Sequence, residues 1–337
     1  MKKLIIIFSV VHIFHCGTAL ASWIKLDAPG ATWTEIRGVD GENIVGHASN
    51  DTWGHDFLYD GTSWSPQAKL VASDSGSYDW GGQTVSISGD YALMGATGHN
   101  YGAAYVFKRD GTSWTQQAKL TASDGGPADD FGQVSLSGDY AIIGAGGWDP
   151  PFPWDNWENT GAAYIFKRDG TSWSEQDRLE GIHTHSNSNF GRTLSISGDY
   201  AIVGANRDKD DAMAALTGAA FIYKRDGTSW NTQGIIKAPD RQAIDLFGYS
   251  VSISSDFAVV GAINDDDNGE NSGSAYVFER NGTSWTLQSK LLASDGADYD
   301  GFGKVSVNGN NVLVGASGDD DDGSMSGSVY VFEAEFP

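Results

Sequence analysis

The sequence predicts an all-β fold, a β-propeller of four-stranded antiparallel blades, from three observations. The phrase DDFGQVSLSGDYAIIGA at Asp129 returns with small changes near Asn189 and at Asp245. The copies recur roughly every 50–60 residues, a period typical of repeat architectures such as propellers. No stretch after residue 21 has the periodicity of an amphipathic helix.

The first element is a predicted signal peptide, residues 1–21. It has a basic start (MKK), the apolar run LIIIFSVVHIF and a small-x-small cleavage site at Ala19–Ala21. The apolar run is short for a bilayer span, so a membrane anchor is the weaker alternative. Cleavage before Ser22 leaves a chain without cysteine and without a transmembrane segment. The predicted location is therefore secreted or cell surface.

Residues 22–337 are predicted to form one propeller domain of six blades, with seven as the alternative. In each copy a strand such as QVSLSGD alternates apolar and small polar residues, and YAIIGA is apolar, as a strand covered on both faces would be. GAAYVFKR and TSWTQQAKL follow, joined by a hairpin turn at RDG. The predicted blades lie near residues 31–70, 79–120, 130–179, 189–237, 246–292 and 301–337.

The last copy stops after its third strand, at GSVYVFEAEFP. The start of the mature chain, SWIKLDAPGA, matches SWTLQSKLLASDGA at Ser284. The strand Ser22–Leu26 is therefore predicted to complete the last blade and close the ring, which removes exposed sheet edges.

The words FG, SVSISGDYAIVGA and GAAYVF resemble the FG-GAP repeat, the blade unit of the integrin α-subunit propeller, in its secreted bacterial form. The resemblance extends from Trp80 to Phe332; the second copy opens with Trp80-Gly81 in place of Phe-Gly, and the first copy is divergent. It implies an extracellular propeller used for adhesion or protein contacts. Calcium-binding blades of the family carry a D-x-D-x-D-G loop between strands one and two. This chain has only SGDY there, as at Ser88–Tyr91, so that calcium site is not carried over.

Loop lengths predict two different faces. The tight turns SGD and RDG gather on one face, and the long loops gather on the other, where binding residues are usually found. The long loops are acidic, as in SDGGPADD from Ser123, NDDDNGENSG from Asn264 and GDDDDG from Gly318. The sequence therefore predicts one acidic and one nearly balanced face. A net charge of −23 argues against nucleic acid and anionic membranes as partners.

Carboxylates in these loops are candidate calcium ligands, because calcium takes several oxygen ligands from flexible loops. Their spacing matches no known metal motif, so solvated turns are the alternative. The candidate metal ligands are Asp265, Asp267, Glu270, Asp319, Asp321 and Asp322.

The third blade has a distinctive loop, GGWDPPFPWDNWENTG, from Gly146 to Gly161. Aromatic rings flanked by acids suit a sugar-binding surface or a protein hot spot. The alternative is that the rings pack over a neighbouring blade or plug the central channel. The candidate ligand-binding residues are Trp148, Trp154, Asp155 and Trp157.

These features predict a non-catalytic binding or adhesion propeller that presents its acidic loops to an extracellular protein, with calcium as a candidate cofactor. The alternative is a carbohydrate-binding propeller that uses the tryptophan-rich loop. His183 and His185 supply too few ligands for a zinc site, and no nucleophile or metalloprotease motif is present. A hydrolase with paired carboxylates is the remaining enzymatic alternative.

Overall fold

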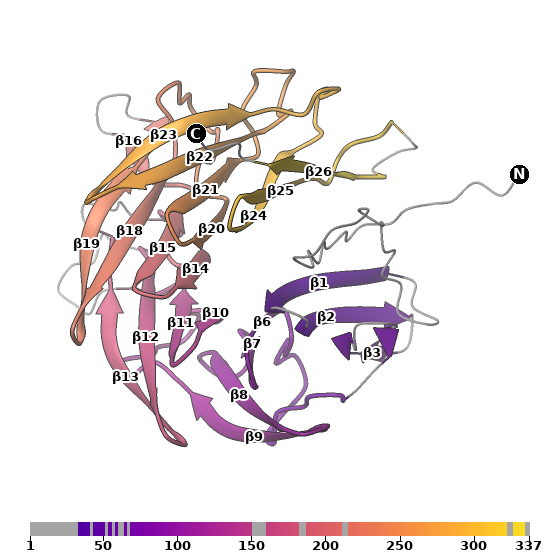
Figure 1. Cartoon of the computed structure of the whole chain (residues 1–337), viewed down its shortest axis with the longest axis vertical. Coiled ribbons are helices and arrows are strands. Elements are labelled where there is room, and N and C mark those ends of the chain that lie inside the picture. Colours follow the sequence, from indigo (N-terminus) through magenta and orange to yellow (C-terminus); the bar gives the residue numbers. More distant parts are fainter. Residues whose placement is uncertain are drawn as a thin grey trace, which may run out of the picture.

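The computed structural model describes residues 33–40, 43–50, 53–55, 58–59, 64–65, 68–149, 160–181, 187–210, 215–321 and 326–333, with side chains from residue 68 onward except at Asp210. Every regular element in these residues is a β-strand. The sheets follow one another around an arc in sequence order, from β1 to β26 (Figure 1). This arrangement is that of propeller blades, and the predicted all-β propeller is confirmed.

The second blade shows the complete repeat. Its strands β6 (Thr84–Ser88), β7 (Tyr91–Ala96), β8 (Ala103–Asp110) and β9 (Ser113–Leu120) pair antiparallel in chain order. The next three blades repeat this order. Their strands are β10 (Phe131–Ser137), β11 (Tyr140–Ala145), β12 (Ala162–Asp169), β13 (Ser172–Leu179); β14 (Thr193–Ser197), β15 (Tyr200–Ala205), β18 (Ala219–Asp226), β19 (Ser229–Ile236); and β20 (Ser250–Ser254), β21 (Phe257–Ala262), β22 (Ser274–Asn281), β23 (Ser284–Leu291).

The first and last copies differ from this pattern in the described residues. The first copy has a three-stranded sheet and a separate strand pair, and the last copy has three strands. The predicted signal peptide 1–21 and the closing strand Ser22–Leu26 lie outside the described residues, so both stay predictions. The remaining strands are β1 (Trp33–Asp40), β2 (Asn43–Asn50), β3 (Trp53–His55), β4 (Leu58–Tyr59), β5 (Trp64–Ser65), β24 (Phe302–Asn308), β25 (Asn311–Ala316), β26 (Ser328–Glu333) and a small hairpin of the fourth blade, β16 (Lys209–Asp210) and β17 (Ala215–Leu216).

The core lies between neighbouring blades. Ile143 of β11 is fully buried in a cluster that also contains Leu93 of the preceding blade, which explains why the second strand is apolar on both faces. Gly144, the last residue but one of this strand, allows the blades to approach closely. A Cβ at Gly144 would lie 1.9 Å from the carbonyl oxygen of Gly191 in the next blade.

Two repeated side chains join the blades. On the first strands, the Leu136 N–H donates to Ser86 Oγ of the preceding blade at 3.0 Å, which explains the small polar residues there. The tryptophan of GTSW packs on a tyrosine of the preceding blade, as Trp173 does on Tyr91 with ring centroids 6.3 Å apart. These tryptophans therefore pack between neighbouring blades. The serine bond recurs at Ser135, Ser195 and Ser252, and the ring contact recurs at Trp230 and Trp285.

Candidate binding face

The long loops lie together because hydrogen bonds join each interblade loop to the loop between the second and third strands. The Gly98 N–H donates to the Asp79 carbonyl at 3.1 Å, and the Gly147 N–H donates to the Asp129 carbonyl at 3.0 Å. We call the surface made by these two sets of loops the loop face. It is the face for which the sequence predicts the acidic loops.

One aspartate in each of several interblade loops serves the shape of the loop. Asp129 Oδ2 accepts the Gly126 N–H at 2.6 Å, and Asp300 Oδ2 accepts the Ala297 N–H at 2.7 Å. Both aspartates are buried, and burial raises the pKa of Asp129. These carboxylates stabilise the loops and are not accessible to a partner.

The residue before this aspartate is large and exposed in three loops. Tyr78, Ile244 and Tyr299 are 82%, 59% and 59% exposed. Their φ angles are 67°, 75° and 69°, in the left-handed region that non-glycine residues rarely adopt. Ala128 and Asn187, at the equivalent positions of the other two loops, have φ angles of 67° and 61°, so this conformation belongs to the repeated loop itself. The loops therefore hold three large side chains out in solvent.

Trp80 is a fourth exposed side chain, 60% exposed. The alignment of Trp80-Gly81 with the Phe-Gly of the other copies is wrong by one residue. The carbonyls of Asp79 and Asp129 accept the same hydrogen bond in their blades, so these two residues correspond. Two positions later stand Gly81 and Phe131. Gly81, and not Trp80, therefore occupies the place of the buried phenylalanine. Trp80 lies one residue earlier, where the backbone again has a positive φ, 53°.

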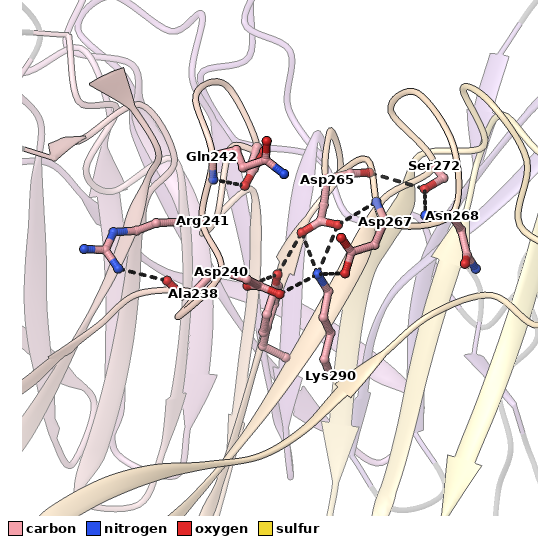
Figure 2. A network of polar contacts seen from close by, with 11 residues as sticks. Ala238, Asp240, Arg241, Gln242, Asp265, Asp267, Asn268, Ser272 and Lys290 are labelled. Atoms are coloured by element: carbon pink, nitrogen blue, oxygen red, sulfur yellow. Dashed lines mark hydrogen bonds and ion pairs between the residues drawn. The ribbon is translucent and has the colours of Figure 1, made fainter. Parts of the chain in front are cut away.

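The fifth blade holds a lysine among three carboxylates (Figure 2). Lys290 Nζ lies 2.8 Å from Asp240 Oδ2, 2.9 Å from Asp265 Oδ2 and 2.5 Å from Asp267 Oδ2. The Tyr276 hydroxyl lies 2.8 Å from Asp265 Oδ2 and 2.9 Å from Asp240 Oδ1. The interblade loop, the loop between β21 and β22, and strands β22 and β23 supply these residues. We call Asp240, Asp265, Asp267 and Lys290 the lysine cluster.

The lysine cluster is charge-compensated. Burial disfavours the charged carboxylate of Asp240, but hydrogen bonds from Lys290 and Tyr276 outweigh burial and lower its pKa. Burial also disfavours the Lys290 ammonium, yet its bonds to the three carboxylates raise the pKa of Lys290. The arrangement therefore favours the charged form of both residues at neutral pH.

The sequence predicts Asp265 and Asp267 as calcium ligands. In the structure, the Lys290 ammonium lies between these two carboxylates. The third predicted ligand of this loop, Glu270, forms its backbone hydrogen bonds with the next interblade loop. Its N–H donates to Asp298 Oδ1 at 2.8 Å, and its carbonyl accepts the Tyr299 N–H at 2.7 Å. Among the residues that the structure describes, no group of three or more histidines and acids is arranged to hold a metal ion.

Two of the other predicted metal ligands lie in the corresponding loop of the last blade. Asp319 is buried, with Oδ2 3.0 Å from the Tyr330 hydroxyl, and its Oδ1 accepts the Asp321 N–H at 3.3 Å. Repulsion from the Asp319 carboxylate raises the pKa of Asp321. Asp322 lies outside the described residues.

The second and third blades also place a cation at the position of Lys290. Lys119 Nζ lies 2.6 Å from Asp74 Oδ2 and 2.8 Å from His99 Nε2. Arg178 forms an ion pair with Asp124. The hydrogen bond from Lys119 lowers the pKa of Asp74. The second, third and fifth blades thus share an ion pair between a cation of the fourth strand and an aspartate of the interblade loop.

Trp148 is buried, which corrects the expectation of an exposed binding ring at this position. Its ring packs in the core between the second and third blades, and the Arg178 guanidinium lies 4.7 Å from the ring centroid. This is the packing alternative for this tryptophan. The other residues of that candidate site, Trp154, Asp155 and Trp157, lie outside the described residues.

The opposite face carries neutralised pairs. Arg109, at the end of β8, lies 2.8 Å from Asp90 in the turn between the first two strands of its blade. Each complete blade has the same pair, which fits the predicted balanced face. The other pairs are Arg168–Asp139, Arg225–Asp199 and Arg280–Asp256.

Five consecutive segments match the family model described as FG-GAP repeat, at residues 64–107, 114–166, 173–223, 230–278 and 285–332. The chain belongs to the FG-GAP repeat family. The first matched segment runs from β5 to β8, and each of the other four runs from the fourth strand of one blade to the third strand of the next. FG-GAP propellers commonly serve binding or adhesion, are generally non-catalytic and are typical of extracellular proteins.

A solved structure gives a more distant comparison. The crystal structure of Saccharomyces cerevisiae Sqt1 is similar over 89% of this chain and 82% of its own chain, with 11% sequence identity and a TM-score of 0.46. No curated protein matches the chain. The part of the FG-GAP chain that the structure describes has no helix of the length and hydropathy needed to cross a membrane.

The sequence prediction missed the exposed side chains Tyr78, Trp80, Ile244 and Tyr299 of the interblade loops, and it missed the role of Lys290. A signal was present for the first group: in three loops a large residue directly precedes the aspartate that lies two positions before the FG step. Lys290 could not be paired with Asp265 from spacing, because the two lie on different strands and loops of the blade.

Proposed function

We propose that this FG-GAP protein is a non-catalytic, secreted or cell-surface propeller that binds a positively charged extracellular protein through its loop face. The observation that carries the proposal is the set of exposed side chains Tyr78, Trp80, Ile244 and Tyr299, which stand among carboxylates. Tryptophan and tyrosine are enriched at the energetic centres of protein interfaces. The surrounding acids favour encounter with a cationic partner.

The loops support this role because they hold the side chains in place before a partner arrives. The Ile244 N–H donates to the Leu216 carbonyl at 2.6 Å, and the Tyr299 N–H donates to the Glu270 carbonyl at 2.7 Å. Both bonds link an interblade loop to the long loop of the neighbouring blade. A preformed contact surface loses less conformational entropy on binding.

The proposed contact does not depend on calcium at the fifth blade, since Lys290 already lies among Asp240, Asp265 and Asp267. If calcium assists binding, the candidate ligands that remain among the described residues are Asp319 and Asp321 of the last blade. The glycan-binding alternative rests on Trp154, Asp155 and Trp157, and no observation on the described residues favours it.

The test is binding of the labelled mature protein to a panel of immobilised extracellular proteins of net positive charge, with poly-L-lysine as a charge-only surface. We expect at least one protein to be bound more tightly than poly-L-lysine. The triple variant Tyr78→Ala, Trp80→Ala, Tyr299→Ala should bind that protein at least ~100-fold more weakly, because each anchor is worth more than about 1 kcal/mol. Leu287→Ala, which truncates an exposed residue of the outer strand β23, is the matched control.

Three results would refute the proposal: an equal loss in the Leu287→Ala control, binding that the triple variant leaves unchanged, or no preference over poly-L-lysine. Retention on immobilised glycans that is lost in Trp154→Ala, Trp157→Ala would instead favour the carbohydrate-binding alternative.

A further inference from the structure

The second blade has a buried histidine at the position where the fifth blade has Asp265. The His99 N–H donates to the Ala96 carbonyl at 3.2 Å, and the Asp265 N–H donates to the Ala262 carbonyl at 3.3 Å, so the two residues correspond. Histidine is the side chain whose charge ordinarily changes between about pH 5 and about pH 8. The third, fourth and last blades have Trp148, Asp208 and Asp319 at this position.

The contacts of His99 define its protonation state in the structure. Lys119 Nζ lies 2.8 Å from His99 Nε2. Because an ammonium can only donate, Nε2 accepts this hydrogen bond, and the imidazole is neutral with its hydrogen on Nδ1. Nδ1 lies 2.8 Å from Asp79 Oδ2 and donates to it. His99 therefore links the interblade loop, which carries Asp79, to strand β9, which carries Lys119.

The other titratable groups around the imidazole keep one charge state near neutral pH. Asp74 Oδ2 lies 3.5 Å from His99 Nε2, and the hydrogen bond from Lys119 lowers the pKa of Asp74. The hydrogen bond from His99 lowers the pKa of Asp79. The Tyr105 ring lies edge-on to the imidazole, with centroids 6.1 Å apart, and burial raises the pKa of its hydroxyl. Mild acidification therefore changes the charge of His99 and not that of the two carboxylates or the tyrosine.

His99 lies beside exposed aromatic rings of the loop face. Tyr78 and Trp80 are the two chain neighbours of Asp79, and they are 82% and 60% exposed. Tyr101, two residues after His99, is 53% exposed. The Asp79 carbonyl also accepts a hydrogen bond from the histidine loop, at 3.1 Å. A rearrangement around His99 would therefore move the backbone that places these rings.

We propose that His99 is a pH switch of the loop face, which holds the partner at neutral pH and releases it in acid; this rests on the proposed binding of a positively charged protein. Protonation places a hydrogen on Nε2 that faces the Lys119 ammonium at 2.8 Å, and two cations cannot share this contact. The imidazolium keeps Asp79 and competes for Asp74, whose Oδ2 lies 2.6 Å from Lys119 Nζ. Lys119 turns to solvent, and the loop that carries both aspartates rearranges.

Acid weakens the contact for two reasons. The rearranged loop no longer holds Tyr78 and Trp80 in place before the partner arrives, so binding has to order them. The added positive charge also lies beside the rings and repels a cationic partner. By linkage, a partner that prefers neutral His99 binds most tightly above the titration range of the histidine, and its affinity is lost as the pH falls through that range.

Fluorine NMR of the mature protein labelled with 5-fluorotryptophan tests the switch without a partner. The Trp80 resonance, assigned by its loss in Trp80→Phe, should shift with one midpoint between about pH 5 and about pH 8. His99→Gln, which stays uncharged and can still bond to both neighbours, should abolish the shift. The resonance of buried Trp230, assigned in the same way, should stay constant. A Trp80 resonance that does not respond, or responds equally in His99→Gln, would overturn the switch.

The variant Lys119→Met tests the contact between the two cations. Without the ammonium, Asp74 and Asp79 stabilise the imidazolium unopposed, so the midpoint of the Trp80 shift should move to higher pH. Lys304→Met, at an exposed lysine of β24, should leave the midpoint where it is. Equal midpoints in these two variants would overturn the proposed competition.

Binding at two pH values separates the switch from the proposed function. The probe is the protein that the immobilised panel selects. The unmutated propeller should bind it at least ~10-fold more weakly at about pH 5 than at about pH 7.5, and His99→Gln should bind it equally at both. Equal affinities in the unmutated propeller would overturn the switch and leave the proposed function standing. If the panel selects no protein, the proposed function is refuted and with it the release step, whereas the fluorine shift still decides the switch in the loop.

Discussion

At the scale of single residues, Lys290 forms ion pairs with Asp240, Asp265 and Asp267. Its ammonium compensates three carboxylates, of which Asp265 has almost no contact with water. Removing one partner of a buried ion pair leaves the other charge uncompensated, and this is more costly than the pair itself is stabilising. The lysine is therefore a structural requirement of the loops it joins.

The variant Lys290→Met should lower the free energy of unfolding by about 3 kcal/mol, because Asp265 would remain buried without its cation. Urea denaturation measures the change. Lys304→Met, at an exposed position, should change stability by no more than about 0.5 kcal/mol. A loss below about 1 kcal/mol for Lys290→Met would show that the carboxylates do not depend on this lysine.

The pKa shifts of the lysine cluster set its pH range. The pKa of Asp240 is lowered from 3.8, so its contribution to stability is present above that pH and is lost as the pH falls through the lower, folded-state value. The pKa of Lys290 is raised from 10.5, so its contribution is present below that pH and is lost as the pH rises through the folded-state value.

The difference in melting temperature between the unmutated protein and Asp240→Asn should therefore be constant from about pH 5 to about pH 9 and shrink below about pH 4. Thermal melts across this range provide the measurement. A difference that varies through neutral pH would contradict the assignment of Asp240 as a charged partner of Lys290.

At the scale of elements, the order of strands follows from the sequence because each strand has its own pattern. Alternating serines, a fully apolar run and a tight turn distinguish the first two strands of every complete blade. The alignment of the second copy could not be read in the same way, because Trp80-Gly81 imitates Phe-Gly. The backbone bond to Asp79 shows that Gly81 stands in the place of Phe131, and the bond from the Gly82 N–H to the Gly95 carbonyl, which corresponds to that from Gly191 to Gly204, agrees with it. Met94 reaches within 3.6 Å of where a Gly81 Cβ would lie.

The glycine one residue before the end of each second strand provides a test of blade packing. A Cβ at Gly261 would lie 1.8 Å from the Gly303 carbonyl oxygen, whereas the nearest described atom to a Cβ at Gly315 is the Lys304 Cβ, at 3.6 Å. Gly261→Ala should therefore destabilise the protein by about 3 kcal/mol, because a backbone would have to move. Gly315→Ala, at the same position of the last blade, should cost less than about 1 kcal/mol. Similar losses by chemical denaturation would mean that the blades do not pack as described.

At the scale of the whole molecule, the sequence predicts which face is acidic but not how that acidity is distributed. Part of it shapes the interblade loops, as at Asp129 and Asp300, and part is compensated by Lys119, Arg178 and Lys290. These pairings join loops to strands that are distant in sequence, so composition and spacing alone could not reveal them. The carboxylates in these two groups are already bonded within the protein, whereas the large exposed side chains of the loop face are accessible to a partner.

The central claim is that Lys119, Arg178 and Lys290 compensate the carboxylates of the second, third and fifth blades, so that the loop face binds through exposed side chains rather than through calcium. The most direct test is a thermal melt of the metal-free mature protein with and without millimolar calcium. A ligand that binds only the folded state raises its stability in proportion to the logarithm of its excess over Kd. We predict no shift in the melting temperature. A clear rise that a chelator reverses and magnesium does not reproduce would contradict the claim.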